Sequence, residues 1–263
     1  MGVTAKEAAT VVLMRDRNNG SSGPEVLLMR RHAKANFGAG LFVFPGGMLE
    51  PEDYSPHALE LCDGLTIEQA ATEIPDSEPV EKALGFRVAA LRETFEEAGV
   101  LLARRADGTE FHPTDQEAPR LLKARADEHY LELVEELGLR LPVGDLVHIG
   151  HWITPVCRPI RFSAHFYLVS VAGAVVAKPD RTEVFDDKWV TPSEALELHE
   201  RGELPLMSPT IINLRWLADY ASTQDALTAL RGKKITTIQP KIVVREDGKE
   251  QLYHPWDQEY ATL

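Results

Sequence analysis

The chain contains little cysteine: Cys62 and Cys157 are the two thiols among its 263 residues. Two cysteines provide neither a disulfide framework nor the paired spacing of a zinc site, which fits a reducing compartment. The N-terminal apolar run is short and broken by Arg15, so it lacks the profile of a signal peptide or a membrane-spanning helix. The sequence ends Ala-Thr-Leu, unlike the Ser-Lys-Leu peroxisomal signal. We therefore expect a cytoplasmic protein with no membrane partner.

Basic residues are also in the minority. The 28 Lys and Arg residues are outnumbered by 41 Asp and Glu residues, which gives a net charge of −13. This balance argues against a surface for nucleic acid or anionic lipid, so no nucleic-acid partner is expected. A phosphate-bearing ligand must then be held by a local group of basic side chains.

The most informative segment is RETFEEAGV, residues 92–100, which places Glu93, Glu96 and Glu97 at positions i, i+3 and i+4. On a helix these glutamates share a sector of about 100°. The opposite side carries the apolar residues Leu84, Val88, Leu91 and Phe95. Like charges at this spacing destabilise a helix by about 0.2–0.5 kcal/mol per pair. The face is therefore either solvated or neutralised by a hard cation such as Mg²⁺ or Mn²⁺, which prefers carboxylate oxygens.

A second segment, Phe44-Pro45-Gly46-Gly47, follows a short apolar strand and by itself indicates only a loop. Together the two segments resemble the sequence box of the Nudix hydrolases, G-x5-E-x7-R-E-U-x-E-E-x-G-U, in which U is aliphatic. Gly47 opens the box and Asp53 stands where its first glutamate is expected. The second half is matched by Arg92, Glu93, Glu96, Glu97, Gly99 and Val100. Thr94 replaces the aliphatic U.

The spacing departs from the family pattern. Arg92 follows Asp53 by 39 residues where the box has 8, so about 31 residues are inserted. The chain is similar in this respect to a long-insert Nudix subgroup that includes the peroxisomal coenzyme A diphosphatases of mammals. The similarity extends over most of residues 8–195, including the stretch LRETFEEAGVLL.

The resemblance implies how the box acts in a metal-dependent hydrolase. Glu93 and Glu97 would bind Mg²⁺ or Mn²⁺, Glu96 would help to hold the cluster, and the Gly46 carbonyl would add a backbone ligand. Arg92 would orient a glutamate. The family often adds one more acid from a later loop. Glu183 is our candidate, with Asp186 and Asp187 as alternatives, although each is equally well explained as a surface acid.

Basic residues near these segments are candidates for phosphate binding, because Arg binds phosphate in a bidentate manner. They are Arg30 and Arg31, with His32 and Lys34 beside them, and later Arg158 and Arg161. An arginine pair at a strand end is also commonly just solvated. Three histidines on apolar strands, His148, His151 and His165, are expected to be structural rather than catalytic.

The resemblance implies an α/β fold, an α/β/α sandwich built on a mixed sheet, as one domain over residues 1–263. The apolar pattern predicts strands at 8–14, 25–30, 41–44, 146–154, 161–171 and 182–190. It predicts helices near 114–137 (interrupted near 127–128), 193–200 and 209–222, and a hairpin from 235–244 and 251–254. A polar loop is expected at 17–23. The glutamate helix should have Pro79 in its first turn and Gly99 as its C-cap. Residues 54–84 and 112–140 are interpreted as inserts, and 205–263 as a C-terminal extension.

The predicted function is hydrolysis of the diphosphate linkage in a small nucleoside-diphosphate substrate. Coenzyme A or acyl-CoA, giving 3′,5′-ADP and (acyl-)phosphopantetheine, is preferred over ADP-ribose or an NADH-type dinucleotide. A non-catalytic nucleotide-binding regulator is the alternative of another class, and the complete set of helix glutamates argues against it. The insert within the box, with its apolar stretch 58–65, is expected either to cover the substrate arm or to pack as structure, with a homodimer contact as a further alternative.

Overall fold

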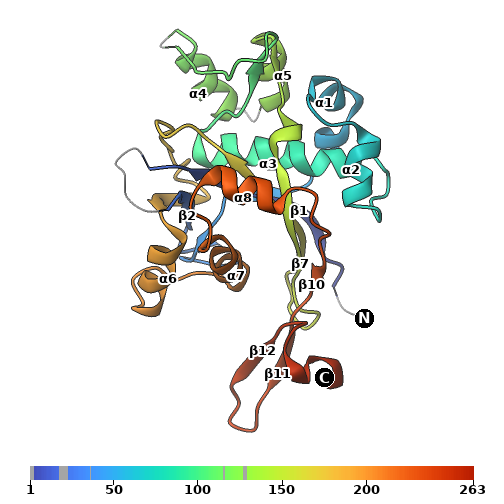
Figure 1. Ribbon diagram of the computed structural model, residues 1–263, viewed down its shortest axis with the longest axis vertical. Coiled ribbons are helices and arrows are strands. Elements are labelled where there is room, and N and C mark those ends of the chain that lie inside the picture. The colour runs from blue at the N-terminus through green and yellow to red at the C-terminus, as the bar shows by residue number, and fades with distance from the viewer. Residues whose placement is uncertain (1–2, 18–22, 36, 115, 127–128) are drawn as a thin grey trace.

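The protein is represented by a computed structural model that describes residues 3–17, 23–35, 37–114, 116–126 and 129–263. It has a central mixed sheet with helices on both faces and a C-terminal arm that projects from one end (Figure 1). Within the described residues, no helix combines the length and the apolar character that crossing a bilayer requires.

The sheet is built around strand β1 (Lys6–Arg15). β1 runs parallel to β8 (Phe162–Ser170) over nine residue pairs, and β8 is antiparallel to β7 (Val147–Ile153). On its other side β1 pairs briefly with β2 (Glu25–Arg31), which in turn pairs with β9 (Val184–Val190). Side chains of β1 alternate between two cores, because successive residues of a strand point to opposite faces.

β1 and β2 diverge after their short pairing, and the chain between them fills the fork. β4 (Gly46–Met48) pairs with β1, and β3 (Phe42–Val43) pairs with β2. The Phe-Pro-Gly-Gly segment therefore lies inside the sheet rather than in a free loop. This placement brings the Gly46-Gly47 backbone to the helix that carries the glutamates.

That helix is α3 (Lys82–Ala98), which packs on one face of the sheet. The other face is covered by α6 (Pro192–Glu200), α7 (Ser208–Leu217) and α8 (Thr223–Leu230), whose apolar residues join the second core. Both cores together form the expected α/β/α sandwich, and α8 crosses in front of the sheet in Figure 1. The α/β fold class inferred from the sequence is thereby confirmed.

Both predicted inserts lie on the α3 side. The first follows the 3-10 helix η1 (Pro51–Tyr54) and contains α1 (Pro56–Leu61) and α2 (Ile67–Glu73). The second contains α4 (Ala118–Ala126) and α5 (Tyr130–Glu136), flanked by the short paired strands β5 (Arg104–Arg105) and β6 (Leu139–Arg140). Apolar residues of α1, α2, α4 and α5 join the same core as α3.

The C-terminal arm begins with β10 (Thr237–Ile238), which runs parallel to β7 at the edge of the sheet. β11 (Lys241–Val244) and β12 (Glu250–Tyr253) then form an antiparallel hairpin, and the 3-10 helix η3 (Gln258–Thr262) follows. The 3-10 helix η2 (Val143–Asp145) completes the structure before β7.

The structure corrects several details of the sequence prediction. The glutamate helix begins at Lys82, and Pro79 precedes it. The charged face of α3 is itself packed, since most of the helix, including Glu97, is buried. α8 was not predicted. The strand expected at 235–244 is divided between β10 and β11, because Pro240 cannot donate a ladder hydrogen bond. The expected interruption at 127–128 lies outside the described residues, as does most of the loop at 17–23.

Three histidines of β7 and β8 line up on the α3 face, as a structural interpretation expects. His165 stacks on His151, with ring centroids 4.1 Å apart, and a 3.1 Å hydrogen bond joins its Nδ1 to Nε2 of His148. Burial, with smaller contributions from Arg87 and His151, lowers the pKa of His148 to about 3. Burial, with smaller contributions from His151, His148 and Arg87, lowers the pKa of His165 to about 2. Both rings are therefore neutral in the folded protein at pH 7.

This pair predicts acid sensitivity. In the unfolded chain the histidines regain an ordinary pKa near 6.5, so the unfolded state binds more protons below that pH. The free energy of unfolding should be highest above pH 6.5 and fall as the pH decreases towards 3, by about 1.4 kcal/mol per pH unit for each buried neutral histidine. Urea unfolding from pH 7 to 4 should show a smaller slope for His165→Gln. The exposed His112→Gln serves as control, and an equal slope in both variants would contradict the prediction.

Candidate active site

Arg92 is the centre of the site. Its Nε and Nη2 donate to the two carboxylate oxygens of Asp53 at 2.8 and 3.0 Å, and Nη2 also donates to the Met48 carbonyl at 2.9 Å. Nη1 donates to Glu93 at 2.9 Å and to Glu96 at 2.8 Å. One guanidinium therefore joins the first acid of the box, strand β4 with its two glycines, and two glutamates of α3.

Asp53 reaches Arg92 despite the insertion that separates them. It is the third residue of η1, where its carboxylate also accepts a 2.8 Å bond from the Glu50 N–H, and it is 1 % exposed. Gly85 of α3 allows this approach, because a Cβ there would lie 2.7 Å from the Cβ of Tyr54. The shorter Asp side chain thus acts as a partner of the arginine.

Glu97 and Glu93 also face the backbone of Gly46 and Gly47 in β4. Glu97 is 3 % exposed and accepts a 3.0 Å bond from the Gly46 N–H. A Cβ at Gly47 would overlap an oxygen of the Glu93 carboxylate, so any larger side chain there would displace this carboxylate. Burial raises the pKa of Glu93 to about 7 against the opposing effect of Arg92, and burial together with Glu93 raises the pKa of Glu97 well above its usual value.

This arrangement fits a divalent cation. Within the described part of the chain, no three His, Cys, Asp or Glu side chains already converge as a ready-made metal site. However, Glu93, Glu96 and Glu97 each use one oxygen in the bonds above, and each carboxylate has a second. Burial opposes ionisation of all three, and a bound cation would remove that penalty. An all-oxygen donor set suits Mg²⁺ or Mn²⁺.

The C-terminal end of α3 is fixed by a residue that sequence reasoning missed. Arg125 of α4 donates to the carbonyls of Glu96 and Glu97 at 2.6 Å each, and to that of Lys178 at 2.7 Å. A cation at this position satisfies carbonyls that have no partner within the helix and complements the helix dipole. Gly99 takes the expected left-handed C-cap conformation, with φ of 66°. Because the second insert supplies this contact, no signal in the box itself could have revealed it.

Thr94, the departure from the box pattern, is fully buried. Its hydroxyl donates to the Ala90 carbonyl of the same helix at 2.7 Å. The polar group is therefore satisfied where the family has an aliphatic residue.

A large cavity of about 1380 Å³ opens onto these groups. The candidates Gly46, Gly47, Asp53, Arg92, Glu93 and Glu96 line it, and so does Glu183. Of the three later acids, Glu183 is thus the one on the cavity wall, and it acts on the pKa values of both Glu93 and Glu97. Asp186 and Asp187 lie on β9, outside the lining that the structure describes.

The basic candidates occupy different positions. Arg31, His32 and Lys34 line the cavity, as do Arg158 and Arg161. The Arg30 guanidinium instead lies over the Phe42 ring, 5.8 Å from its centroid, and is not among the lining residues described. The Arg161 guanidinium is bound to the carbonyls of Val3 and Thr154 at 2.5 and 3.1 Å. Arg158 forms a bidentate ion pair with Glu250.

Two further cavity residues were not predicted. Lys6 at the start of β1 adds a cation to the wall, and Tyr130 of α5 adds a buried phenol. Lys6 gave no sequence signal because a strand end is a common place for lysine. Tyr130 lies in the second insert, 30 residues after Val100, the last residue of the box.

The fold and the carboxylate cluster match a known class of enzymes. The model of the NUDT19 Nudix domain family matches residues 5–217. The chain therefore belongs to this Nudix family and is a Nudix hydrolase. A Nudix hydrolase from Alicyclobacillus acidocaldarius has a similar structure, with a TM-score of 0.67 and 27 % identity over 87 % of this chain and 98 % of that one.

Curated relatives extend the similarity. Acyl-coenzyme A diphosphatase NUDT19 from Homo sapiens is 29 % identical over 91 % of this chain and 73 % of its own length. The protein of the same name from Xenopus laevis is 26 % identical over 89 % of this chain and 70 % of its own length. The subgroup inferred from the sequence is confirmed by these matches.

The Arg92 contacts predict a large stability effect. Arg92→Met would leave the buried Asp53 carboxylate and two glutamates without their partner, which should lower the free energy of unfolding by about 3–5 kcal/mol. Urea unfolding at pH 7 in EDTA would measure it. Arg201→Met, which breaks an exposed ion pair with Glu203, should change little. Equal effects of the two substitutions would show that Arg92 does not hold the site together.

Proposed function

We propose that this protein hydrolyses the diphosphate linkage of coenzyme A or acyl-CoA, giving 3′,5′-ADP and (acyl-)phosphopantetheine. The observation that carries the proposal is the continuity of one cavity, which joins Glu93 and Glu96 of the box to basic side chains and to an extended apolar wall. The names of the curated relatives favour the same substrate class.

A divalent cation is part of the proposal, since Nudix enzymes generally use one. Glu93, Glu96, Glu97 and the Gly46 carbonyl would hold Mg²⁺ or Mn²⁺, which would neutralise the diphosphate and lower the pKa of an attacking water. Arg92 holds Glu93 and Glu96 in position. Glu183 is the candidate to accept the proton of the water, because it stands exposed on the same cavity wall.

Cations on the cavity wall would bind the substrate phosphates. Arg31 is the best placed, because it lies close enough to lower the pKa of Glu97 while its Nε is oriented by the Phe37 carbonyl at 3.0 Å. Lys6 and Lys34 are exposed cations on the same cavity. We propose that Arg158 and Arg161, whose guanidinium groups are bonded to protein groups, support the wall rather than bind phosphate as expected from the sequence.

ADP-ribose or an NADH-type dinucleotide is the competing substrate. The edge-to-face pair of Phe37 and Phe162 on the cavity wall, with ring centroids 5.2 Å apart, offers a surface for a base that all these substrates share. We further propose, as expected from the sequence, that the enzyme acts in the cytoplasm and has no nucleic-acid partner. A homodimer is part of the same proposal.

Glu97→Gln tests the chemistry. The substitution is nearly isosteric and removes one charge at the proposed metal site, so kcat should fall about 1,000-fold or more with little change in melting temperature. Activity of the wild type should disappear in EDTA and return with Mg²⁺ or Mn²⁺. Glu200→Gln at the end of α6 is the control and should keep full activity.

The substrate is tested by incubating the wild type with coenzyme A, acyl-CoA, ADP-ribose and NADH and measuring product masses. Formation of 3′,5′-ADP with phosphopantetheine supports the proposal. Preferential cleavage of ADP-ribose or NADH would overturn it, and undiminished turnover by Glu97→Gln would remove this glutamate from the metal site.

A further inference from the structure

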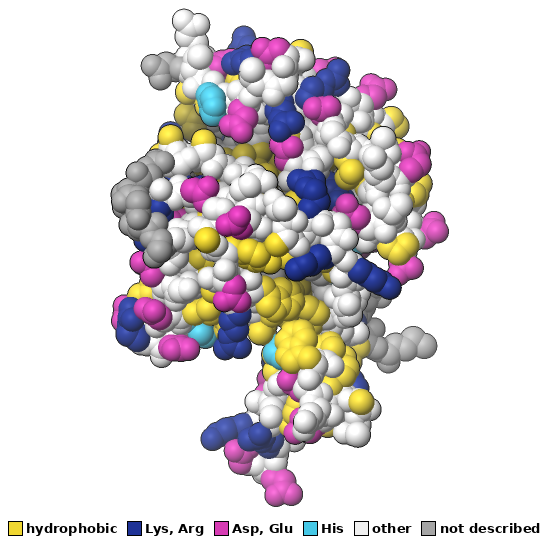
Figure 2. Space-filling model, viewed as in Figure 1, with side chains coloured by type: hydrophobic (Ala, Val, Ile, Leu, Met, Phe, Trp, Pro, Cys, Tyr) yellow, Lys and Arg dark blue, Asp and Glu magenta, His cyan; other side chains and the backbone are white. Residues whose placement is uncertain are grey.

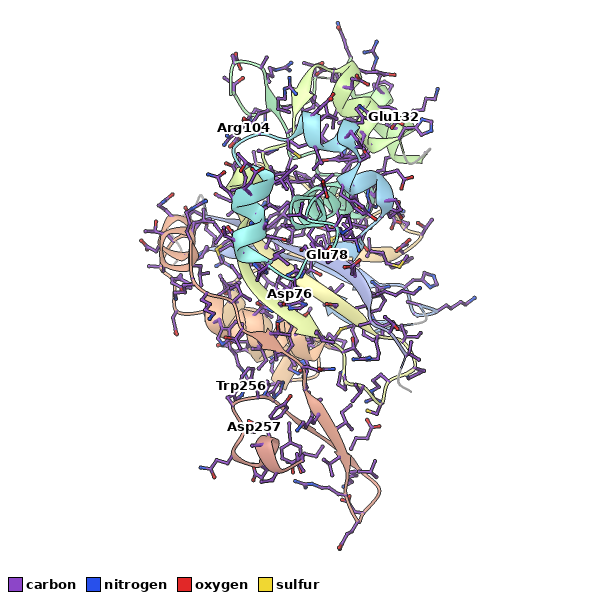
Figure 3. The ribbon with its side chains drawn as sticks, turned by 90° about the vertical axis from the view of Figure 1, so that its right-hand side faces the viewer. Asp76, Glu78, Arg104, Glu132, Trp256 and Asp257 are labelled. Atoms are coloured by element: carbon purple, nitrogen blue, oxygen red, sulfur yellow. The ribbon has the colours of Figure 1, made fainter. Side chains whose placement is uncertain are left out.

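The cavity continues well beyond the glutamates, to the C-terminal arm. Its far end is lined by Ile153 and Ile160 at the β7–β8 connection, and by Pro240, Ile242 and Leu252 of the arm. Tyr130, Leu131 and Glu132 of α5 line the opposite end. Glu132 and the arm lie at opposite ends of the molecule in Figure 3, so the cavity is long.

The arm presents one face of its hairpin to the cavity. Ile242 and Leu252 are directly opposite each other in the β11–β12 ladder, and both line the cavity. Val243, the next residue along β11, is not among the lining residues described, as expected from the alternation of side chains along a strand. A cross-strand aliphatic pair thus closes the far end.

Contacts at the base of the hairpin hold this wall in place. Trp256 stacks on His254 with ring centroids 4.7 Å apart and meets Trp216 of α7 at 6.3 Å. Trp216 in turn lies 6.4 Å from Trp152 of β7. Apolar side chains gather at this junction of arm and body in Figure 2, and Figure 3 shows Trp256 on the side of the arm nearer the body.

An ion pair also connects the hairpin to the loop between β7 and β8. Arg158 donates from Nη1 and Nη2 to the two oxygens of Glu250 on β12, at 3.1 and 2.5 Å. Since Pro155 to Phe162 line the cavity with few exceptions, the ion pair connects the two segments that form its far wall. The hairpin is therefore a supported part of the cavity.

We propose that the β11–β12 hairpin binds the acyl chain of the substrate and selects for acyl-CoA over free coenzyme A. Ile160, Ile242 and Leu252 offer aliphatic surface, which suits a flexible hydrocarbon and provides neither stacking nor hydrogen bonds for a base. The proposal rests on the proposed function, because the arm must lie beyond a diphosphate held at the glutamates. The hairpin also lies outside residues 5–217, which the family model matches.

The sequence suggested that the first insert could cover the acyl or pantetheine arm of the substrate. We assign this role to the hairpin instead. Residues 56–77 are absent from the lining of the cavity as the structure describes it. Their apolar side chains, including Ala58, Leu61 and Ala70, are buried in the core with α3. The second insert does reach the cavity, but through Tyr130, Leu131 and Glu132 at the other end.

The test compares acyl chain lengths. For the wild type with Mg²⁺, kcat/KM should rise from coenzyme A through hexanoyl-CoA to dodecanoyl-CoA, by up to about fourfold for each methylene that becomes buried. Ile242→Asp should lower the ratio of kcat/KM for dodecanoyl-CoA to that for coenzyme A by at least tenfold. Val243→Asp introduces the same charge on the opposite face of β11 and should keep the wild-type ratio. Melting temperatures of both variants check the fold.

The outcomes separate the two proposals. If the wild type cleaves coenzyme A and the ratio is the same in wild type, Ile242→Asp and Val243→Asp, the hairpin does not bind the chain and the inference is wrong. If Ile242→Asp lowers turnover of coenzyme A, ADP-ribose and dodecanoyl-CoA by the same factor, the far end holds a part common to all substrates, which also overturns it. Failure of the wild type to cleave any CoA species overturns the proposed function, and the inference with it.

Discussion

The guanidinium of Arg92 is the interaction on which the site depends. It is buried, and its five bonds reach Asp53, the Met48 carbonyl, Glu93 and Glu96. Without it, three carboxylates would lie close together in a poorly solvated space, where their mutual repulsion is strong. The arginine also holds together the two parts of the box, at Asp53 and at α3, between which the first insert lies. An insert of about 31 residues is tolerated because both of its ends are anchored at this one side chain.

Helix α3, which carries the three glutamates, is supported by contacts from two segments outside the second half of the box. The first insert packs on α3 and returns Asp53 to Arg92, while the second sends Arg125 to the carbonyls of Glu96 and Glu97. Substitution of Arg125 would therefore act on catalysis through the position of the helix end. Glu97 belongs to the last turn of α3, so its side chain depends on that end being ordered. The inserts are thus structural supports of the site.

The local parts of the fold could be predicted from the sequence, because they depend on local patterns. The spacing of Glu93, Glu96 and Glu97 determines that they share a helix side, and the continuous apolar runs of β1 and β8 indicate strands that are buried on both faces. The sequence could not show that the glutamate side is also covered, because that depends on η1 and β4 packing against it. Arg125 and the hairpin wall were missed for the same reason: their contacts join segments between 28 and about 90 residues apart.

The chemistry of the cavity changes along its length, from carboxylates and basic side chains to aliphatic side chains, and this gradient would allow a chain of net charge −13 to hold the proposed polyanionic substrate. Carboxylates at one wall require a cation before a diphosphate can approach them, and nearby cations such as Arg31 and Lys34 give local compensation. The aliphatic far end adds binding energy that does not depend on charge. If the far end binds an acyl chain as proposed, burial of that chain, remote from the reacting bond, would hold the diphosphate in position against the repulsion of the glutamates. The apolar far end of the cavity, between the arm and the body, would therefore be a physical complement to an acidic catalytic centre.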